Sequence, residues 1–197
     1  MAPARQFVEP ARYTEEQYLA WEVEATEKSE YIDGEIRAMS GGTEPHASIP
    51  MSIAALLWNG LRGKACRVLS SDMKIWTAGA FYYPDLSVVC GTSIYRNGNK
   101  HVVTNPIVVI EVLSPGTEPK DRGEKFIRYL QIETLRSYLL VTQTEARVEL
   151  FERGEKGNWI YSMVTGLENA IEIPSLGVML ALSEVYDQVE FENAEDE

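Results

Sequence analysis

Cysteine and histidine are both scarce in this 197-residue chain, which contains two of each. The cysteines, Cys66 and Cys90, are far apart in the sequence and form no CxxC pair. This pattern predicts neither a disulfide framework nor, with so few histidines, a zinc cluster. We expect both cysteines to be reduced thiols within the protein core.

Long apolar runs are also missing. No window approaches the roughly 18 consecutive apolar residues that a membrane helix needs, and the N-terminus lacks the pattern of a signal peptide. Hydrophobic residues nevertheless make up 45% of the chain, which is enough for a substantial core. We therefore expect a soluble, cytoplasmic protein without membrane contact.

Positive charge is in deficit, because 18 Lys and Arg residues stand against 30 Asp and Glu residues and the net charge is −12. A protein that binds a polyanion normally presents a basic surface, so this balance argues against strong nonspecific binding of nucleic acid. Four cations that lie close together in the sequence could line a basic groove or form an ordinary solvated surface: Arg62, Lys64, Arg67 and Lys74.

The last ten residues are acidic and have little apolar content. We expect residues 188–197 to form a solvated or frayed tail. No internal repeat, low-complexity linker or change in composition divides residues 1–187, so a single domain is expected there.

Two helices are expected in the N-terminal third. Thr14 is a suitable cap for a helix over residues 14–21. Helical spacing of apolar residues over residues 45–61 predicts the second, in which Pro50 is tolerable only if it falls in the first turn. Between the two helices, Asp33 and Gly34 separate two alternating runs, which is typical of a hairpin with a type I′ turn.

The rest of the chain is rich in strand patterns, with a helix expected within residues 115–131. Strands are expected at residues 66–69, 73–77, 84–90, 106–113, 137–142, 147–153, 159–164 and 170–173. We therefore expect an α/β (α+β) fold in which a mixed β-sheet is flanked by helices, preceded by an N-terminal helix and hairpin.

Two acidic residues interrupt apolar strands. Asp85 opens the run DLSVVC directly after Pro84, and Glu111 closes the run IVVIEV directly before LSP. A buried carboxylate costs several kcal/mol unless it is paired with a cation or hydrogen-bonded. Magnesium prefers one or two carboxylates with water and phosphate oxygens, so adjacent strands could bring these two side chains to one Mg²⁺ ion. Alternatively, Asp85 only ends a strand and Glu111 pairs with an arginine such as Arg128.

The helix that follows could supply a cation to this site. Asp121, Lys125 and Tyr129 are spaced by four residues and lie on one helical face, from which Lys125 could lean toward Glu111. There it would orient or deprotonate an attacking water and stabilise the charge of the transition state. An exposed pair between Asp121 and Lys125 is the alternative.

The sequence resembles the Uma-type restriction endonuclease family of the PD-(D/E)xK nuclease superfamily. The resemblance rests on EYIDG at residues 30–34, YPD at 83–85 and EVLSP at 111–115, together with Asp121, Lys125 and Tyr129. It extends over nearly the whole chain through YTEEQYLAWE at 13–22, YLLV at 138–141, RVELFER at 147–153 and PSLG at 174–177. The ordered set is more specific than any single motif.

This resemblance implies roles for individual residues. Asp85 matches the aspartate of the PD motif and Glu111 matches the (D/E) position, while Leu113 stands where the superfamily lysine is expected. The family is thought to recruit a lysine from the adjoining helix, and Lys125 fits that position. The expected metal site comprises Asp85, Glu111 and Val112.

Two further residues match family-like positions. Glu30, before the hairpin turn, could reach the metal through a water or form a surface pair. His46, near the start of the second helix, could contact a phosphate or cap that helix. Asp121 and Tyr129 are expected to support the site.

The resemblance therefore predicts a Mg²⁺-dependent endonuclease, with Mn²⁺ as an alternative metal, that cleaves DNA and acts as a homodimer. Asp85, Glu111, Lys125 and Glu30 are the expected catalytic residues. A second hypothesis is a protein that keeps the nuclease fold but has lost catalysis and serves as a binding or regulatory module, as Leu113 and the net charge suggest. A third is an assembly scaffold whose β-rich segments, such as LFER and WIYSM, form a subunit contact.

Overall fold

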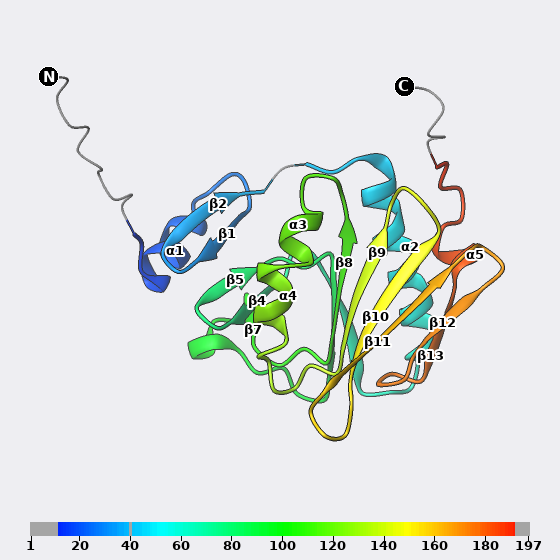
Figure 1. The fold of residues 1–197 in the computed structure, drawn as a ribbon. Coiled ribbons are helices and arrows are strands. Elements are labelled where there is room, and N and C mark those ends of the chain that lie inside the picture. The colour runs from blue at the N-terminus through cyan, green and yellow to red at the C-terminus, as the bar shows by residue number, and fades with distance from the viewer. Residues whose placement is uncertain (1–11, 40, 192–197) are drawn as a thin grey trace, which may run out of the picture.

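The computed structural model describes residues 12–39 and 41–191 (Figure 1). Its helices are α1 (Glu15–Glu22), α2 (Glu44–Gly60), α3 (Glu118–Asp121), α4 (Glu124–Tyr129) and α5 (Leu182–Val185), with a 3-10 turn η1 (Arg96–Gly98). Its strands are β1 (Ser29–Ile32), β2 (Glu35–Ala38), β3 (Cys66–Ser70), β4 (Lys74–Thr77), β5 (Ala80–Tyr82), β6 (Leu86–Cys90), β7 (Val102–Val103), β8 (Val108–Leu113), β9 (Ser137–Thr142), β10 (Arg147–Arg153), β11 (Trp159–Thr165), β12 (Ala170–Ile173) and β13 (Val178–Ala181).

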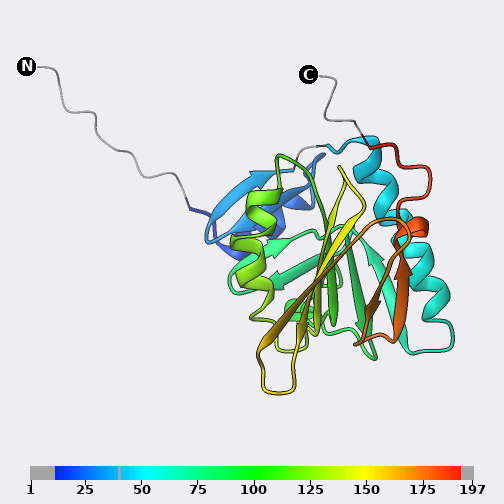
Figure 2. The ribbon, with the colours of Figure 1, turned by 45° about the vertical axis from the view of Figure 1, so that its right-hand side comes forward.

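The strands form three sheets. A six-stranded sheet of order β11-β10-β9-β8-β6-β3 stands at the centre of the molecule, and only its β8–β9 pair is parallel. A five-stranded sheet of order β2-β1-β5-β4-β7 lies beside it, and β12 and β13 form a small hairpin sheet. Figure 2 shows α2, α5 and the β12–β13 hairpin on one face of the central sheet and α3 and α4 on the other. This confirms the expected mixed sheet flanked by helices.

Strand β8 determines how the layers pack, because both of its faces are buried. Val108, Ile110 and Val112 pack in the cluster formed with α2, α5, β12 and β13. Val109 and Leu113 point to the opposite cluster, which contains residues of α4 and of the five-stranded sheet. Each fully buried Val, Leu or Ile contributes roughly 1.5–3 kcal/mol of transfer free energy. The alternation places Glu111 on the same face as Val109 and Leu113.

The N-terminal predictions are confirmed. Thr14 caps α1 through a capping box with Gln17, whose side chain also accepts a hydrogen bond from the Thr14 N–H. Strands β1 and β2 form an antiparallel hairpin in which Ile32 lies opposite Glu35. The two turn residues between them, Asp33 and Gly34, both have positive φ, as a type I′ turn requires.

Helix boundaries differ from the prediction in two places. Pro50 lies inside α2 rather than in its first turn. The helix therefore forms although Pro50 has no backbone N–H to donate. The segment after β8 forms two short helices instead of one, and the chain bends at Gly123 (φ −111°, ψ −100°). A Cβ atom at Gly123 would lie 2.8 Å from the Pro119 carbonyl oxygen, so the bend requires a glycine.

Five short elements were not predicted from the sequence: β5, η1, β7, β13 and α5. Each has two to four residues, which is too short for a period of apolar residues to be recognised. At the C-terminal end, Val189 and Phe191 pack against the core cluster, and the ring of Phe191 contacts Tyr186. The rest of the expected acidic tail, residues 192–197, lies outside the described residues. No helix of the described ranges has the length and apolar character needed to cross a membrane.

The prediction that Cys66 and Cys90 are reduced thiols is wrong for this structure. The two residues lie directly opposite each other in the antiparallel register of β3 and β6 and are joined by a disulfide. The sequence could not show this, because the two cysteines are 24 residues apart and meet only through the register of two strands. The bond links β3, at one edge of the central sheet, to β6.

This crosslink should stabilise the fold measurably. Closing a loop of this length restricts the unfolded chain and contributes about 3 kcal/mol, or roughly 6–12 °C in melting temperature for a protein of this size. We expect protein purified without reductant to contain no alkylatable thiol after denaturation, and reductant to lower its melting temperature. The double variant Cys66→Ser/Cys90→Ser should melt at the lower temperature with or without reductant. Two free thiols in the untreated protein would contradict the expectation.

Candidate active site

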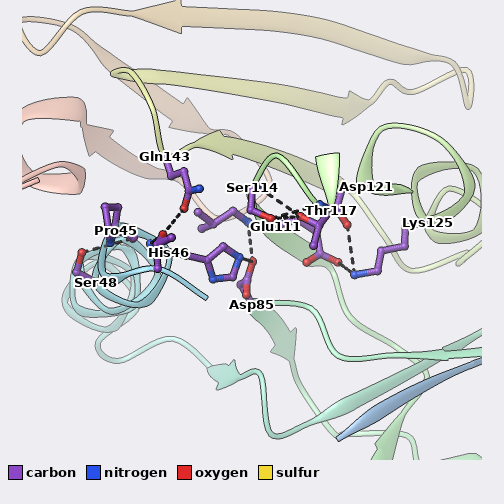
Figure 3. Close-up of polar contacts among 12 residues, drawn as sticks. Pro45, His46, Ser48, Asp85, Glu111, Ser114, Thr117, Asp121, Lys125 and Gln143 are labelled. Atoms are coloured by element: carbon purple, nitrogen blue, oxygen red, sulfur yellow. Dashed lines mark hydrogen bonds and ion pairs between the residues drawn. The ribbon is translucent and has the colours of Figure 1, made fainter. Parts of the chain in front are cut away.

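Seven of the residues singled out from the sequence line one cavity of about 330 Å³. They come from four regions of the chain: the β1–β2 hairpin, the start of α2, the β6–β8 pair and the α3–α4 segment. Figure 3 shows His46, Asp85, Glu111 and Lys125 pointing toward one another across this cavity. The seven residues are Glu30, His46, Asp85, Glu111, Val112, Asp121 and Lys125.

Asp85 lies at the bend immediately before β6, next to the central strand β8. Its Oδ2 atom accepts a hydrogen bond from the Val112 N–H at 2.6 Å, so the side chain continues the pairing of β6 with β8. The Nε2 atom of His46 lies 3.8 Å from the same oxygen. Burial raises the pKa of Asp85, and this effect is opposed by His46 and by the Val112 N–H.

Glu111 is almost fully buried within β8, with 3% of its surface exposed. Its Oε1 atom accepts a hydrogen bond from the Tyr129 hydroxyl at 3.1 Å and lies 3.3 Å from the Lys125 Nζ atom. Burial raises the pKa of Glu111 well above its usual range; nearby carboxylates act in the same direction, and Lys125 opposes them. The free energy of holding this carboxylate ionised therefore depends on nearby positive charge.

Lys125 is the buried cation of the site. Its Nζ atom lies 2.9 Å from Glu30 Oε1, 3.3 Å from Glu111 Oε1 and 3.3 Å from Asp121 Oδ1. Burial by itself would lower the pKa of Lys125, but these three carboxylates raise it well above its usual value. The ammonium therefore keeps its proton at neutral pH.

Negative charge exceeds positive charge at this site. Four carboxylates converge on the cavity, and of the described residues one lysine is buried among them. Two buried oxygens, Glu30 Oε1 and Asp121 Oδ1, accept no hydrogen bond, although each lies close to the Lys125 ammonium. A further cation would relieve this imbalance, so the donor set fits a divalent ion.

The donors fit a hydrated ion rather than a closed cage. Within residues 12–39 and 41–191, no group of three or more His, Cys, Asp and Glu side chains is arranged to hold a metal by itself. Asp85 and Glu111 would supply two carboxylates, which is typical of magnesium with its retained waters. The Val112 side chain packs in the cluster on the α2 side of β8, so this residue could contribute only main-chain atoms.

Leu113 occupies the position two residues beyond Glu111. It shares the strand face of Glu111, but it packs in the apolar cluster formed with α4 and is 2% exposed. Lys125 brings an ammonium to the same carboxylate from α4 instead. Tyr129, one turn further along α4, donates a hydrogen bond from its hydroxyl to Glu111. The helix bend at Gly123 does not separate Asp121 from Lys125, because Asp121 Oδ1 still lies 3.3 Å from Lys125 Nζ.

His46 lies at the beginning of α2, where the Thr43 hydroxyl accepts a hydrogen bond from the His46 N–H at 3.4 Å. The Thr43 hydroxyl also donates a hydrogen bond to Oε1 of Gln143 at 2.9 Å, although Gln143 lies 100 positions later in the chain. The mouth of the cavity includes two cations, Arg37 and Lys120. Sequence reasoning missed Arg37, Lys120, Thr43 and Gln143, because only the folded chain brings them to the site.

Other pairings proposed from the sequence do not form. Arg128 pairs with Asp33 and Glu124 rather than with Glu111. The four clustered cations do not line the cavity: Lys74 pairs with Glu22, Arg67 donates to the Gly91 carbonyl, and Lys64 donates to the Leu176 carbonyl. The basic groove expected as one alternative is therefore absent at the site among the described residues.

The buried carboxylate of Glu111 gives a testable pH dependence. A carboxyl whose folded pKa lies above its unfolded value, here near 4.5, lowers stability as pH rises through the folded pKa. Glu111→Gln should therefore raise the melting temperature at neutral pH in EDTA, by about 2–4 °C per kcal/mol gained. Added Mg²⁺ should raise the melting temperature of the wild type and leave that of the variant unchanged.

Glu149 provides the matched control. Its hydrogen bonds from Arg122 lower its pKa, so its carboxylate stabilises the fold above the unfolded pKa. Glu149→Gln should lower the melting temperature at neutral pH and leave the Mg²⁺ response intact. Equal destabilisation by the two substitutions in EDTA would contradict the assignment of Glu111.

Comparison with known proteins places the chain in a family. Residues 15–183 match the family model Uma2, described as "Putative restriction endonuclease". Two uncharacterized proteins of Synechocystis are similar: slr1290 is 36% identical over 178 residues, covering 89% of this chain and 92% of that protein. The second, sll1609, is 33% identical over 159 residues, covering 80% of this chain and 89% of its own.

The fold is also found in a solved structure. A crystal structure described as a putative nuclease belonging to DUF820, from Anabaena variabilis, superimposes with a TM-score of 0.73. The match covers 90% of this chain and 99% of the other at 17% sequence identity. At that identity the likeness concerns the fold.

Proposed function

The chain belongs to the Uma2 family, described as "Putative restriction endonuclease", and from this premise we propose that it is a Mg²⁺-dependent endonuclease that hydrolyses DNA phosphodiester bonds. Asp85 and Glu111 hold the metal, with Mn²⁺ as a possible substitute, and Lys125 assists the attack of water. The observation that carries the proposal is the position of the buried Lys125 ammonium. Its Nζ atom lies 3.3 Å from Glu111 Oε1, in a cluster with more carboxylates than cations.

The carboxylates are suited to an ion that brings its own water. A bound Mg²⁺ ion would lower the pKa of a coordinated water and polarise a phosphoryl oxygen. Asp85 is held in place by the Val112 N–H, and Glu111 is held by Tyr129 and Lys125. Both carboxylates are therefore fixed before a metal binds, which lowers the cost of reorganisation.

Lys125 acts as a cation in this proposal. The surrounding carboxylates raise its pKa, so it does not serve as the base that removes a proton from water. Its ammonium instead orients the water and stabilises the negative charge that grows on the phosphate in the transition state. Glu30 and Asp121 hold the ammonium beside Glu111.

Substrate binding would rely on a small set of cations at the cavity mouth. Arg37 and Lys120 line the cavity, and His46 lies beside Asp85. These groups could contact the phosphates on either side of the cleaved bond. Because the net charge of the chain is −12, affinity for DNA should be low and should fall further as salt rises.

A second candidate function is a binding or regulatory module that keeps the fold without catalysis. Leu113 at the lysine position favours it, and the Lys125 ammonium beside Glu111 argues against it.

The homodimer and the cytoplasmic location expected from the sequence are also part of the proposal that the chain is an endonuclease.

Cleavage of supercoiled plasmid DNA tests the proposal directly. With Mg²⁺ or Mn²⁺, the wild type should nick or linearise the plasmid, and EDTA should abolish the reaction. Asp85→Ala should reduce the rate by about 1,000-fold or more, because the metal loses a carboxylate, and Lys125→Met by about 100-fold or more. Wild-type activity in folded Asp85→Ala would refute the site.

A matched substitution separates chemistry from substrate binding. Lys120→Met removes a cation from the cavity mouth but leaves the buried cluster intact. It should raise KM and the sensitivity to salt with little change in kcat, whereas Lys125→Met should lower kcat. The catalytically inactive alternative is favoured if the wild type binds no Mg²⁺ by calorimetry and shows no metal-dependent cleavage.

Moving the lysine tests whether Lys125 replaces the residue expected at position 113. Leu113 shares the strand face of Glu111, so the double variant Leu113→Lys/Lys125→Met offers an ammonium to the same carboxylate from β8. We expect the double variant to recover part of the activity lost in Lys125→Met. Circular dichroism should establish that both variants are folded, because position 113 is buried. Failure of a folded double variant to recover activity would contradict the interpretation.

A further inference from the structure

One of the two edges of the central sheet is an uncharged strand. β11 is the outermost strand, and within the described residues it pairs only with β10 (Figure 1). Its sequence, WIYSMVT, has no charged residue and no proline. Ile160, Tyr161 and Met163 are 54%, 52% and 49% exposed. Proteins usually protect such an edge with charges, proline or a covering segment, because its unpaired N–H and C=O groups can pair with another strand.

We propose that the edge of β11 binds β11 of a second copy of the protein. The two strands pair antiparallel about a two-fold axis at Ser162, so that two six-stranded sheets join into one continuous sheet. Two-fold symmetry makes such a contact self-complementary, because each copy contributes the same strand edge. The proposal rests on the homodimer proposed above and names its interface, and its test does not depend on the proposed nuclease activity.

The register centred on Ser162 places apolar side chains opposite one another. Tyr161 lies opposite Met163 of the second copy, and Ile160 lies opposite Val164. Ser162 lies opposite itself. Directly opposed residues project from the same face of an antiparallel pair, so these side chains would cover each other's exposed surface.

The same register is complementary in charge at both ends. Lys156, in the turn between β10 and β11, is brought near Glu168 of the second copy, and the symmetric pair forms at the other end. Both side chains are exposed, and neither forms an ion pair within the described part of its own chain. Two copies of net charge −12 repel each other. An uncharged strand with opposite charges at its two ends reduces this repulsion where the copies meet.

Helix α2 also exposes apolar side chains, with Met51 and Trp58 at 68% and 66% exposure. Its backbone donors and acceptors are already paired within the helix, so it lacks the unpaired backbone groups that β11 has. This difference favours β11 as the contact and makes α2 the matched control surface.

Sedimentation equilibrium of the full chain in EDTA, over a range of protein concentrations, tests the proposal. The wild type should form a reversible dimer. Ser162→Glu puts two like charges on the axis and should raise the dissociation constant at least about tenfold. Lys156→Glu and Glu168→Lys should each weaken the dimer severalfold, and the double variant should restore it. Met51→Glu on α2 should have no effect. Circular dichroism checks that each variant is folded.

The outcomes separate clearly. Loss of the dimer in Ser162→Glu together with recovery in the charge-swapped double variant supports the proposed strand pairing. A wild type that stays monomeric at about 100 µM, roughly the upper range of ordinary specific association, overturns it. So does a dimer that persists in Ser162→Glu, or one that only Met51→Glu dissociates.

Discussion

The ammonium of Lys125 joins three separate parts of the protein. It contacts β1 through Glu30, the central strand β8 through Glu111, and α3 through Asp121. Removing one partner from a buried ion pair leaves an uncompensated charge and commonly costs about 3–5 kcal/mol. The lysine therefore positions the hairpin against the central sheet, and it also holds Glu111, one of the two proposed metal ligands, in place. Stability and chemistry depend on the same contacts.

Strand β8 makes this arrangement possible. Its two faces belong to different core clusters, so Glu111 can lie on the α4 side while Val112 packs on the α2 side. The Val112 N–H then remains available to Asp85 at the adjacent strand. A single strand thus supplies one carboxylate and fixes another. The apolar residues on both sides provide the free energy that keeps these charges out of water.

The sequence was most informative where a pattern was long or chemically costly. Strands of five or more residues, such as β8 and β9, were found from their apolar runs, and Asp85 and Glu111 stood out because charges rarely interrupt such runs. Lys125 followed from helical spacing, although the helix bends at Gly123. The contact between Glu30 and Lys125 joins residues 95 positions apart and was not visible in any local pattern.

The misses have the same physical origin. The disulfide between Cys66 and Cys90 depends on the register of β3 with β6, which apolar periodicity does not specify. The hydrogen bond between Thr43 and Gln143 depends on where α2 begins relative to the end of β9. Local sequence determines which residues form an element, whereas these contacts depend on how separate elements dock.

The spread of the cluster along the chain also bears on when the protein can become active. Asp85 and Glu111 are synthesised before Lys125, and β8 is not enclosed until β9 has paired beside it. A nascent chain that has emerged only as far as β8 therefore has both carboxylates but lacks the ammonium that pairs with Glu111. Because loop-closure entropy must be paid before such non-local contacts form, the activity proposed for this site would arise only once most of the domain is complete, and incomplete chains would lack it.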